Sequence, residues 1–223
     1  LSGTVINADS MQVYGDLSVL TARPGSKEEA RAPHRLFGAL PASEACSVGR
    51  WLEMAAAEIE AALGGGRLPI AVGGTGLYLK ALTEGLADIP DVPEAVRREV
   101  KGEYESLGGE AFRDQLAKLD PEGAAKLPAS DRQRLERAMA VVRATGRPLA
   151  DWQGEQPEGP ALQARFWTLV LMPEREDLYA ASDARFDRML AAGALDEVRA
   201  LVSQGLDPGR PAGHRVTDFL FRE

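Results

Sequence analysis

The chain has little cysteine and histidine, and it lacks any long apolar run. Of its 223 residues, only Cys46 is a cysteine, and His34 and His214 are the two histidines. A single thiol excludes an internal disulfide and a cysteine-based zinc site, and two isolated histidines lack the spacing of metal ligands. No apolar run approaches the ~18 residues that span a bilayer, and no signal peptide is visible. We therefore expect a cytoplasmic protein without membrane contact.

What is present is an ordinary globular composition with an acidic balance. The chain is 44% hydrophobic and 27% charged, and its formal net charge is −8. This balance argues against a partner made only of phosphate, although a local basic patch can still bind nucleic acid. The length suits one α/β domain, or a core domain with a smaller unit attached. Because Leu1 stands only three residues before an apolar run, we expect the chain to begin inside a fold.

Short apolar runs closed by Gly, Pro or Asp predict three buried parallel strands, at residues 4–8, 69–73 and 166–172. Helical patterns separate the strands, and this alternation predicts a parallel α/β sheet. Ser47 and the glycines at 64–66 are typical of the two ends of a helix. The helices are expected at 47–63, 77–86, 131–145, 174–192 and 195–204.

Residues 90–129 have no strand pattern. They predict short charged helices at 93–107, 109–119 and 121–127, separated by Pro and Gly. We therefore expect a helical insertion domain at 90–129. It would interrupt an α/β core made of residues 1–89 and 130–223.

The first predicted strand ends in polar residues, Asp9 and Ser10. Ligands of open α/β sheets bind beyond the carboxyl ends of the strands, so Asp9 is a candidate general base. Ser10 and Gln12 stand beside it as hydrogen-bonding groups. A strand followed by a simple Asp-Ser turn, in which these side chains bond their own backbone, explains the same pattern.

A glycine-rich turn follows the second predicted strand, with the sequence Gly73-Gly74-Thr75-Gly76. Glycines between a strand and a helix let the backbone approach a ligand, and the amino terminus of the helix favours an anion. A tight turn between strand and helix requires glycine in any case.

Arginines are concentrated on the helix predicted at 131–145. A stripe of guanidinium groups in an acidic protein suggests phosphate contacts. The other interpretation is a solvated face that pairs with nearby Asp and Glu. Arg185 stands alone on a later amphipathic helix, where an arginine usually forms a surface ion pair. The arginines of the stripe are Arg132, Arg134, Arg137 and Arg143, with Arg147 just after.

Together these segments resemble the tRNA dimethylallyltransferase family, also called tRNA isopentenyltransferases. The Asp-Ser-x-Gln run at 9–12 and the Gly-Gly-Thr-x-x-Tyr run at 73–78 are the most specific matches. The matches keep the family's order and cover about residues 1 to 210. They lie at 6–14, 21–24, 33–36, 47–48, 72–78, 131–137 and 185–189.

The resemblance implies an α/β fold, a P-loop-kinase-like parallel sheet flanked by helices, with a helical insertion domain. It also implies transfer of a dimethylallyl group from dimethylallyl diphosphate to tRNA. The acceptor is the exocyclic amine of the adenosine 3′-adjacent to the anticodon. Two alternatives stay open: an isopentenyltransferase that acts on free adenine nucleotides, and an inactive fragment that only binds tRNA.

Roles for single residues follow from the resemblance. Asp9 is the general base, and Arg185 binds the leaving diphosphate together with Gly73 and Gly74. The insertion at 90–129 contacts the tRNA anticodon stem-loop, and we expect a monomer. The residues that match tRNA-contacting positions are Asp9, Ser10, Met11, Gln12, Thr75, Arg97, Gln133, Arg134, Leu135, Glu136 and Arg137.

The chain departs from the family in one major respect. The family's phosphate-binding run, Gly-x-x-x-x-Gly-Lys-Ser/Thr, is absent from these 223 residues. That run supplies the Lys for the diphosphate and the hydroxyl for Mg²⁺. The family implies Mg²⁺ as cofactor, but no residue of this sequence is predicted as its ligand. The tail from Gly213 also no longer follows the family, so we expect a chain truncated at both ends.

Overall fold

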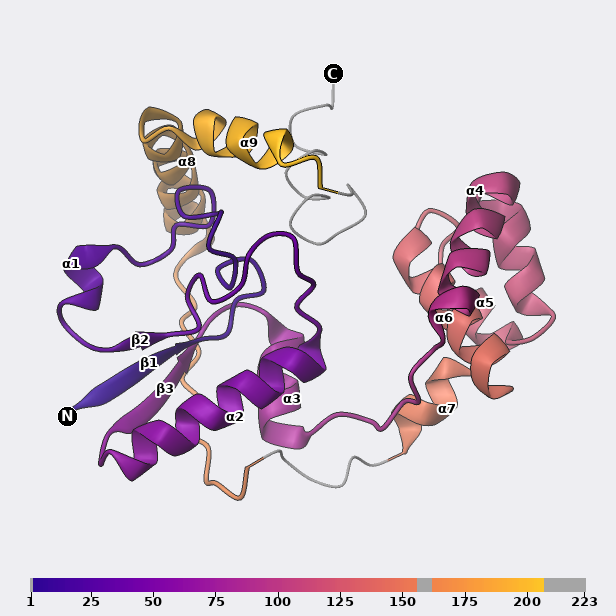
Figure 1. Cartoon of the computed structure of the whole chain (residues 1–223), viewed down its shortest axis with the longest axis horizontal. Helices are drawn as coiled ribbons and strands as arrows, with labels where there is room; N and C mark the ends of the chain where they lie inside the picture. Colours follow the sequence, from indigo (N-terminus) through magenta and orange to yellow (C-terminus); the bar gives the residue numbers. More distant parts are fainter. Residues whose placement is uncertain (1, 156–161, 207–223) are drawn as a thin grey trace. The chain divides into compact units, whose positions relative to one another are not determined.

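A computed structural model describes residues 2–155 and 162–206 of the chain (Figure 1). The chain forms two compact units. Unit 1 contains Leu1–Glu84 and Pro160–Glu223, and unit 2 contains Gly85–Gly159. Each unit has its own buried core, so each is described by itself.

Unit 1 is built on a parallel sheet. Strand β1 (Gly3–Asn7) lies between β2 (His34–Arg35) and β3 (Leu68–Val72). In this register Val5 is opposite both His34 and Ile70. The strands predicted at 4–8 and 69–73 are therefore confirmed, each displaced by one residue.

Two helices pack against the sheet and against each other, α2 (Val48–Gly64) and α3 (Gly76–Glu84) (Figure 1). Ser47 caps α2, because its hydroxyl accepts a hydrogen bond from the Arg50 backbone N–H at 3.1 Å. The rings of Trp51 and Tyr78 stack between these helices with centroids 4.3 Å apart. The fully or nearly buried residues of this core are Ile6, Ala8, Trp51, Ala55, Ile59, Tyr78, Leu82 and Leu162.

The remaining helices of unit 1 are α1 (Ser26–Glu29), α8 (Arg175–Ala191) and α9 (Ala194–Ser203). Helix α9 packs Val198 and Leu201 on the segment that follows β1, where Val13 and Leu17 are buried. Helix α8 contacts α9 but has no buried residue.

The strand predicted at 166–172 is wrong. This segment forms no strand, and Leu169 and Leu171 are 85% and 82% exposed. A parallel strand needs a neighbour about 4.8 Å away that completes its hydrogen bonds. Across the described ranges, the sheet ends at β3 and no strand pairs with 166–172. The outward face of β3 is also open, because Leu68, Ile70 and Val72 are exposed.

Unit 2 is helical, with α4 (Glu94–Ala117), α5 (Pro121–Lys126), α6 (Arg132–Thr145) and α7 (Leu149–Gly154). Gly108 breaks α4 with φ 74° and ψ 166°, a conformation that glycine adopts without a Cβ clash. The two helices predicted at 93–107 and 109–119 therefore meet end to end at this glycine.

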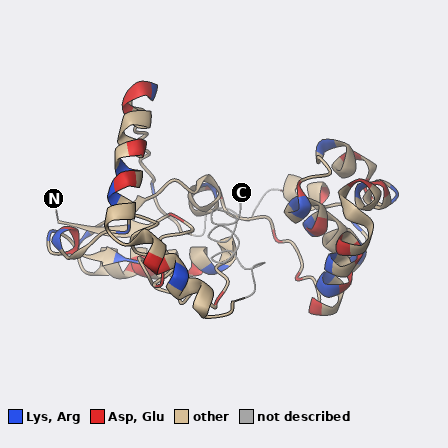
Figure 2. Cartoon of the chain, turned by 90° about the horizontal axis from the view of Figure 1, so that it is seen from above, with Lys and Arg blue, Asp and Glu red and all other residues tan. Residues whose placement is uncertain are grey.

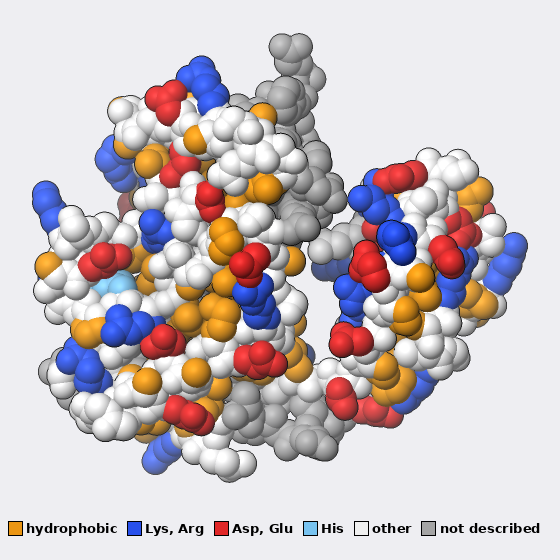
Figure 3. Space-filling view, in the orientation of Figure 1, with side chains coloured by type: hydrophobic (Ala, Val, Ile, Leu, Met, Phe, Trp, Pro, Cys, Tyr) orange, Lys and Arg blue, Asp and Glu red, His pale blue; other side chains and the backbone are white. Residues whose placement is uncertain are grey.

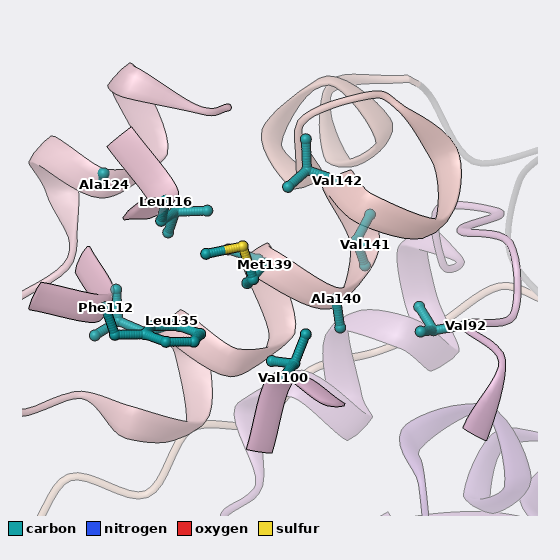
Figure 4. Packing of buried hydrophobic residues seen from close by; sticks show 11 residues of the cluster. Val92, Val100, Phe112, Leu116, Ala124, Leu135, Met139, Ala140, Val141 and Val142 are labelled. Atoms are coloured by element: carbon teal, nitrogen blue, oxygen red, sulfur yellow. The ribbon is translucent and has the colours of Figure 1, made fainter. Parts of the chain in front are cut away.

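The Arg-rich helix α6 belongs to unit 2. Its apolar stripe, with Leu135 and Met139 at the centre, is buried against Val100, Phe112 and Leu116 of α4 (Figure 4). We assign a helix to the unit whose core buries its apolar face. The helical unit therefore extends over Gly85–Gly159, beyond the 90–129 expected from the sequence.

Candidate active site

Asp9 lies two residues after β1, in a turn that its own side chain closes. Its Oδ1 accepts hydrogen bonds from the backbone N–H groups of Met11 at 2.7 Å and Gln12 at 3.2 Å. The Asp-Ser turn predicted as an alternative is therefore present. In the described part of the chain, Oδ2 accepts no hydrogen bond, and Asp9 is half-buried. One carboxylate oxygen thus closes the turn, while the other is left for a ligand.

Asn7, at the end of β1, holds this turn through hydrogen bonds to the backbone of Asp9. The sequence patterns did not identify it as a site residue. Its Oδ1 accepts from the Asp9 N–H at 2.8 Å, and its Nδ2 donates to the Asp9 carbonyl at 2.9 Å. The side chain is completely buried. The available signal was an Asn at the end of an otherwise apolar strand.

Thr75 ties the glycine-rich turn to the Asp9 turn. Its Oγ1 accepts from the Ser10 N–H at 2.9 Å, and its own N–H donates to the Ala8 carbonyl at 3.3 Å. The two motifs that were separate in the sequence are therefore one structure at the carboxyl ends of β1 and β3. The Thr75 hydroxyl proton is still available to a ligand, because the hydroxyl can accept and donate at once.

The two adjacent glycines of this turn differ in their surroundings. A Cβ at Gly73 would lie 2.2 Å from the carbonyl carbon and oxygen of Ala8, whereas a Cβ at Gly74 would meet nothing within 4 Å. The close approach of the Ala8 backbone thus explains why position 73 has a residue without a Cβ. The diphosphate role of Gly73 and Gly74 stays a prediction.

Gln12 and Met11 extend the site away from the sheet. The Gln12 amide donates from Nε2 to the carbonyl of Thr21 at 2.8 Å, which anchors the following loop. Met11 is half-buried and packs on the core beneath α9. Both residues contribute backbone N–H groups to Asp9, so their first role in this structure is to hold the carboxylate.

Arg185 is exposed on α8. Among the described residues, no hydrogen bond or ion pair joins its guanidinium to the Asp9 turn or to an acidic side chain. The surface ion pair that the sequence suggested for Arg185 is therefore not formed. Its role toward a diphosphate stays a prediction.

In unit 2, most arginines of α6 are already paired with carboxylates. Arg132 contacts Glu105 at 2.9 Å and Glu136 at 2.6 Å. Basic and acidic residues are interspersed along these helices, as the colours of the ribbon at the right of Figure 2 show. The interpretation as a paired, solvated face holds for four arginines. The other three and their partners are Arg134 with Asp131, Arg143 with Glu103 and, just after the end of α6, Arg147 with Asp151 and Glu155.

Arg137 differs from these four. It forms no ion pair within the described residues, and burial together with the nearby positive charge of Arg97 lowers its pKa from the usual arginine value. Asp91 acts in the opposite direction but more weakly. Arg97 and Arg137 carry interacting charges, and neither forms an ion pair among the described residues, so together they are a candidate anion site beside Asp91.

Leu135 is buried, and its predicted tRNA contact stays a prediction. Its side chain is 0% exposed and lies in the core of unit 2 (Figure 4), so it does not offer a side-chain contact to tRNA. Glu136 is held by Arg132, while Gln133 is exposed. The predicted run 133–137 therefore divides into residues that face the core and residues that face solvent, because a helix turns 100° per residue.

Mg²⁺, the cofactor that the resemblance implies, has no evident set of ligands among the described residues. In the described ranges, no group of three or more His, Cys, Asp or Glu side chains could hold a metal ion. The phosphate-binding run that would supply a hydroxyl ligand is absent from the sequence.

The surface gives no single-sign patch on the face seen in Figure 3, where acidic and basic side chains mix over both units. Within the described residues, no helix combines the length and apolar character that crossing a bilayer requires.

Comparisons with known proteins agree on one family. The family model described as IPP transferase matches residues 12–216. A tRNA dimethylallyltransferase of Rhodospirillum centenum is 59% identical over 212 residues, which cover 95% of this chain and 68% of that protein. The corresponding protein of Paramagnetospirillum magneticum is 53% identical, with coverages of 94% and 66%. The chain thus spans about two thirds of the length of these curated relatives.

Solved structures give the same result. A full-length tRNA isopentenylpyrophosphate transferase of Bacillus halodurans superposes with a TM-score of 0.58 at 30% identity, covering 98% of this chain and 69% of that one. A eukaryotic dimethylallyltransferase acting on tRNA superposes with a TM-score of 0.71, also at 30% identity, covering 92% of this chain and 52% of that one.

Proposed function

Because the chain belongs to the IPP transferase family, we propose that it transfers a dimethylallyl group from dimethylallyl diphosphate to tRNA. The acceptor is the exocyclic amine of the adenosine 3′-adjacent to the anticodon. The observation that carries this assignment is the Asp9 turn. It places a carboxylate with one unoccupied oxygen beyond the end of β1, against the glycine-rich turn that follows β3.

The chemistry requires a base. The exocyclic amine of adenine is a weak nucleophile because its lone pair is delocalised into the ring. In the transfer, nitrogen forms a bond to the first allylic carbon, and the bond from that carbon to the diphosphate oxygen breaks with its electron pair. The proton leaves the nitrogen for Asp9 Oδ2. A positioned base of this kind typically contributes about 10²–10⁴-fold to the rate.

The leaving diphosphate carries the developing negative charge. Arg185 and the backbone N–H groups at Gly73 and Gly74 are the groups of this chain that we assign to it. Cationic groups and N–H donors aimed at such charge stabilise the transition state. We assign the chain to the cytoplasm, as a monomer.

Unit 2 takes the tRNA anticodon stem-loop in this proposal. Arg97 and Arg137 bind backbone phosphate, since their charges interact and neither forms an ion pair among the described residues, although the weaker influence of Asp91 also reaches Arg137. The adenosine must leave its stack to reach Asp9, which costs a few kcal/mol. Phosphate contacts away from the base can offset that cost.

The test of the base uses Asp9→Asn and Asp9→Ala. Both are made in the chain completed with the flanking segments of its Rhodospirillum centenum relative, and kcat is measured with labelled dimethylallyl diphosphate. Asn keeps the oxygen that closes the turn but removes basicity. We expect both variants to lower kcat by about 10²–10⁴-fold, with tRNA affinity unchanged for Asn. A wild-type rate in Asp9→Asn would refute the base assignment.

The acceptor is tested with three substrates: tRNA with adenosine next to the anticodon, the same tRNA with guanosine there, and free AMP. We expect transfer to the first only. Transfer to AMP at a comparable kcat/KM would favour the alternative enzyme that acts on free nucleotides.

The tRNA surface is tested on the chain itself with Arg137→Gln and the matched control Arg143→Gln from the same helix. Arg143 is outside the residues predicted to contact tRNA and already contacts Glu103 at 2.6 Å, so its substitution should change tRNA affinity little. For Arg137→Gln, the slope of log affinity against log salt concentration should fall by roughly one. Equal effects of the two variants would contradict the assignment of Arg137. If the chain binds tRNA and the completed protein shows no transfer, the alternative of a fragment that only binds tRNA is supported.

A further inference from the structure

Asn7 is a buried polar side chain whose hydrogen-bonding groups are all occupied. Its Oδ1 accepts from the Asp9 N–H at 2.8 Å, and its Nδ2 donates to the carbonyls of Asp9 at 2.9 Å and Leu36 at 3.1 Å. The side chain is 0% exposed. These partners fix the orientation of the amide, because an N–H needs an acceptor and the two carbonyls need donors.

The backbone of Asn7 is held as firmly as its side chain. It pairs with Val72 in the ladder between β1 and β3. Its carbonyl accepts a hydrogen bond from Trp51 Nε1 at 2.8 Å, and the Trp51 ring stacks on Tyr78. Asn7 therefore cannot shift without breaking contacts to the sheet and to α2.

This arrangement fixes the peptide groups on both sides of the Asp9 Cα. The Asp9 N–H and C=O are both bonded to one rigid amide, while Oδ1 is held by the N–H groups of Met11 and Gln12. The direction of the remaining oxygen, Oδ2, is then set. Groups that are placed to within a fraction of an ångström react faster than groups that must find their position.

We propose that Asn7 is a positioning residue for Asp9, which sets the direction of Oδ2 toward the acceptor amine. The proposal rests on the proposed function, in which Asp9 is the base. Leu36 takes part through its carbonyl, which is presented by a left-handed backbone conformation with φ 63°. Asn7 thereby links the loop after β2 to the turn after β1.

If Asn7 only stabilised the fold, its substitution would lower thermal stability without impairing the base. Thr4 is the matched control for this case. Thr4 is the other buried polar residue of β1, at 4% exposure, and its Oγ1 accepts from Arg67 Nε at 3.1 Å. Thr4 lies on the same strand as Asn7 and is similarly buried, but it has no contact with the Asp9 turn. Asn7→Ser and Thr4→Val should therefore both lower thermal stability, and only Asn7→Ser should impair the base.

The experiment is a double-mutant cycle in the completed protein, with kcat, KM for tRNA and the pH profile measured for Asn7→Ser, Asp9→Asn and the pair. We expect Asn7→Ser to lower kcat by between about tenfold and 100-fold at unchanged KM. In the Asp9→Asn background it should have no further effect. Thr4→Val should keep kcat within about twofold, in line with its lack of contact with the site.

The outcomes separate the two proposals. If Asp9→Asn keeps the wild-type rate, the base assignment fails, and the role of Asn7 fails with it. If Asp9→Asn is impaired but Asn7→Ser matches Thr4→Val, or adds its full effect in the Asp9→Asn background, the positioning role is overturned while the function stands. If Asn7→Ser does not fold, Trp51→Phe decides, because it removes the bond to the Asn7 carbonyl while keeping an aromatic ring in the core against Tyr78. A kcat loss in Trp51→Phe that disappears in the Asp9→Asn background supports the role, and additivity overturns it.

Discussion

Gly73→Ala is the substitution for which the structure gives the clearest expectation. The new Cβ would lie 2.2 Å from both the carbonyl carbon and the carbonyl oxygen of Ala8, and 2.7 Å from the Asp9 nitrogen. Contacts between carbon and these atoms are comfortable at about 3.5 Å. The two backbones would therefore have to separate by more than an ångström. No flexible side chain can absorb this movement, since all three atoms belong to the main chain.

The cost follows from what lies at this point. The Ala8 N–H donates to the Val72 carbonyl at 2.8 Å in the last bond of the β1–β3 ladder. Overpacking of this kind typically costs about 1–3 kcal/mol. In a chain of this size, each kcal/mol lowers Tm by roughly 2–4 °C. We expect Gly73→Ala to lower the Tm of unit 1 by about 2–12 °C by these figures.

The assay is thermal unfolding of the chain followed by circular dichroism, with Gly74→Ala as the matched control. A Cβ at Gly74 meets nothing within 4 Å, and Gly74 is not among the glycines with positive φ. Its Tm should stay within about 2 °C of the wild type. Equal Tm values for the two variants would refute the argument that Gly73 is required for close packing.

Two further predictions concern groups that hold the segment after β1. Glu197→Gln should lower the free energy of unfolding by about 1–2 kcal/mol in urea titrations. The reason is that its carboxylate accepts three backbone N–H bonds, from Ser18, Val19 and Leu20, at 2.6–2.9 Å. If Glu197→Gln lowers the free energy of unfolding no more than the exposed substitution Asp196→Asn, this prediction is wrong. Asp16 has a pKa below its usual value, chiefly because Gln204 donates to it at 2.8 Å. Its stabilising contribution is therefore complete above the unfolded pKa of about 3.9, and it is lost as the pH falls through the lower folded pKa. The difference in the free energy of unfolding between wild type and Asp16→Asn should therefore shrink over that acidic range. If this difference is the same at neutral pH and at a pH well below both pKa values, the lowered pKa of Asp16 does not contribute to stability.

The elements that the sequence predicted well are those whose signals are local. The strand at 4–8 and the helix at 47–63 have apolar spacing and end signals in their own residues, such as the Ser47 cap. The Asp9 turn is of the same kind, because Oδ1 bonds groups only two and three residues ahead. The interpretation as an Asp-Ser turn is confirmed, whereas the role of Asp9 as general base stays a prediction that would use the second carboxylate oxygen.

The signals that failed depend on distant partners. The apolar run at 166–172 shows a need for burial, but a strand also needs a neighbour, which no local pattern supplies. The stripe on α6 shows that the helix packs, without showing that it packs on α4. The resemblance predicts a tRNA contact for Leu135 from its place in a family run, and only the fold shows that its side chain faces the core.

Asn7 was missed for the same reason. An Asn at the end of an apolar strand is a polar interruption when only its neighbours are known. Its importance depends on the carbonyl of Leu36, 29 residues later, and on Trp51, 44 residues later. Such residues become visible only when the chain is folded.

The contact of Glu197 with residues 18–20 joins segments that are 177 to 179 positions apart in the sequence. On a ribosome that adds about 5–20 residues per second, Glu197 is made roughly 10–35 s after its partners. Throughout that interval the three N–H groups must remain hydrated. All of Gly85–Gly159 is synthesised in the meantime, and its helices rely on contacts close in sequence, which form fast. Unit 2 can therefore complete its core while unit 1 still waits for α9, so the bonds from Glu197 that secure the segment next to Asp9 form late in the nascent chain.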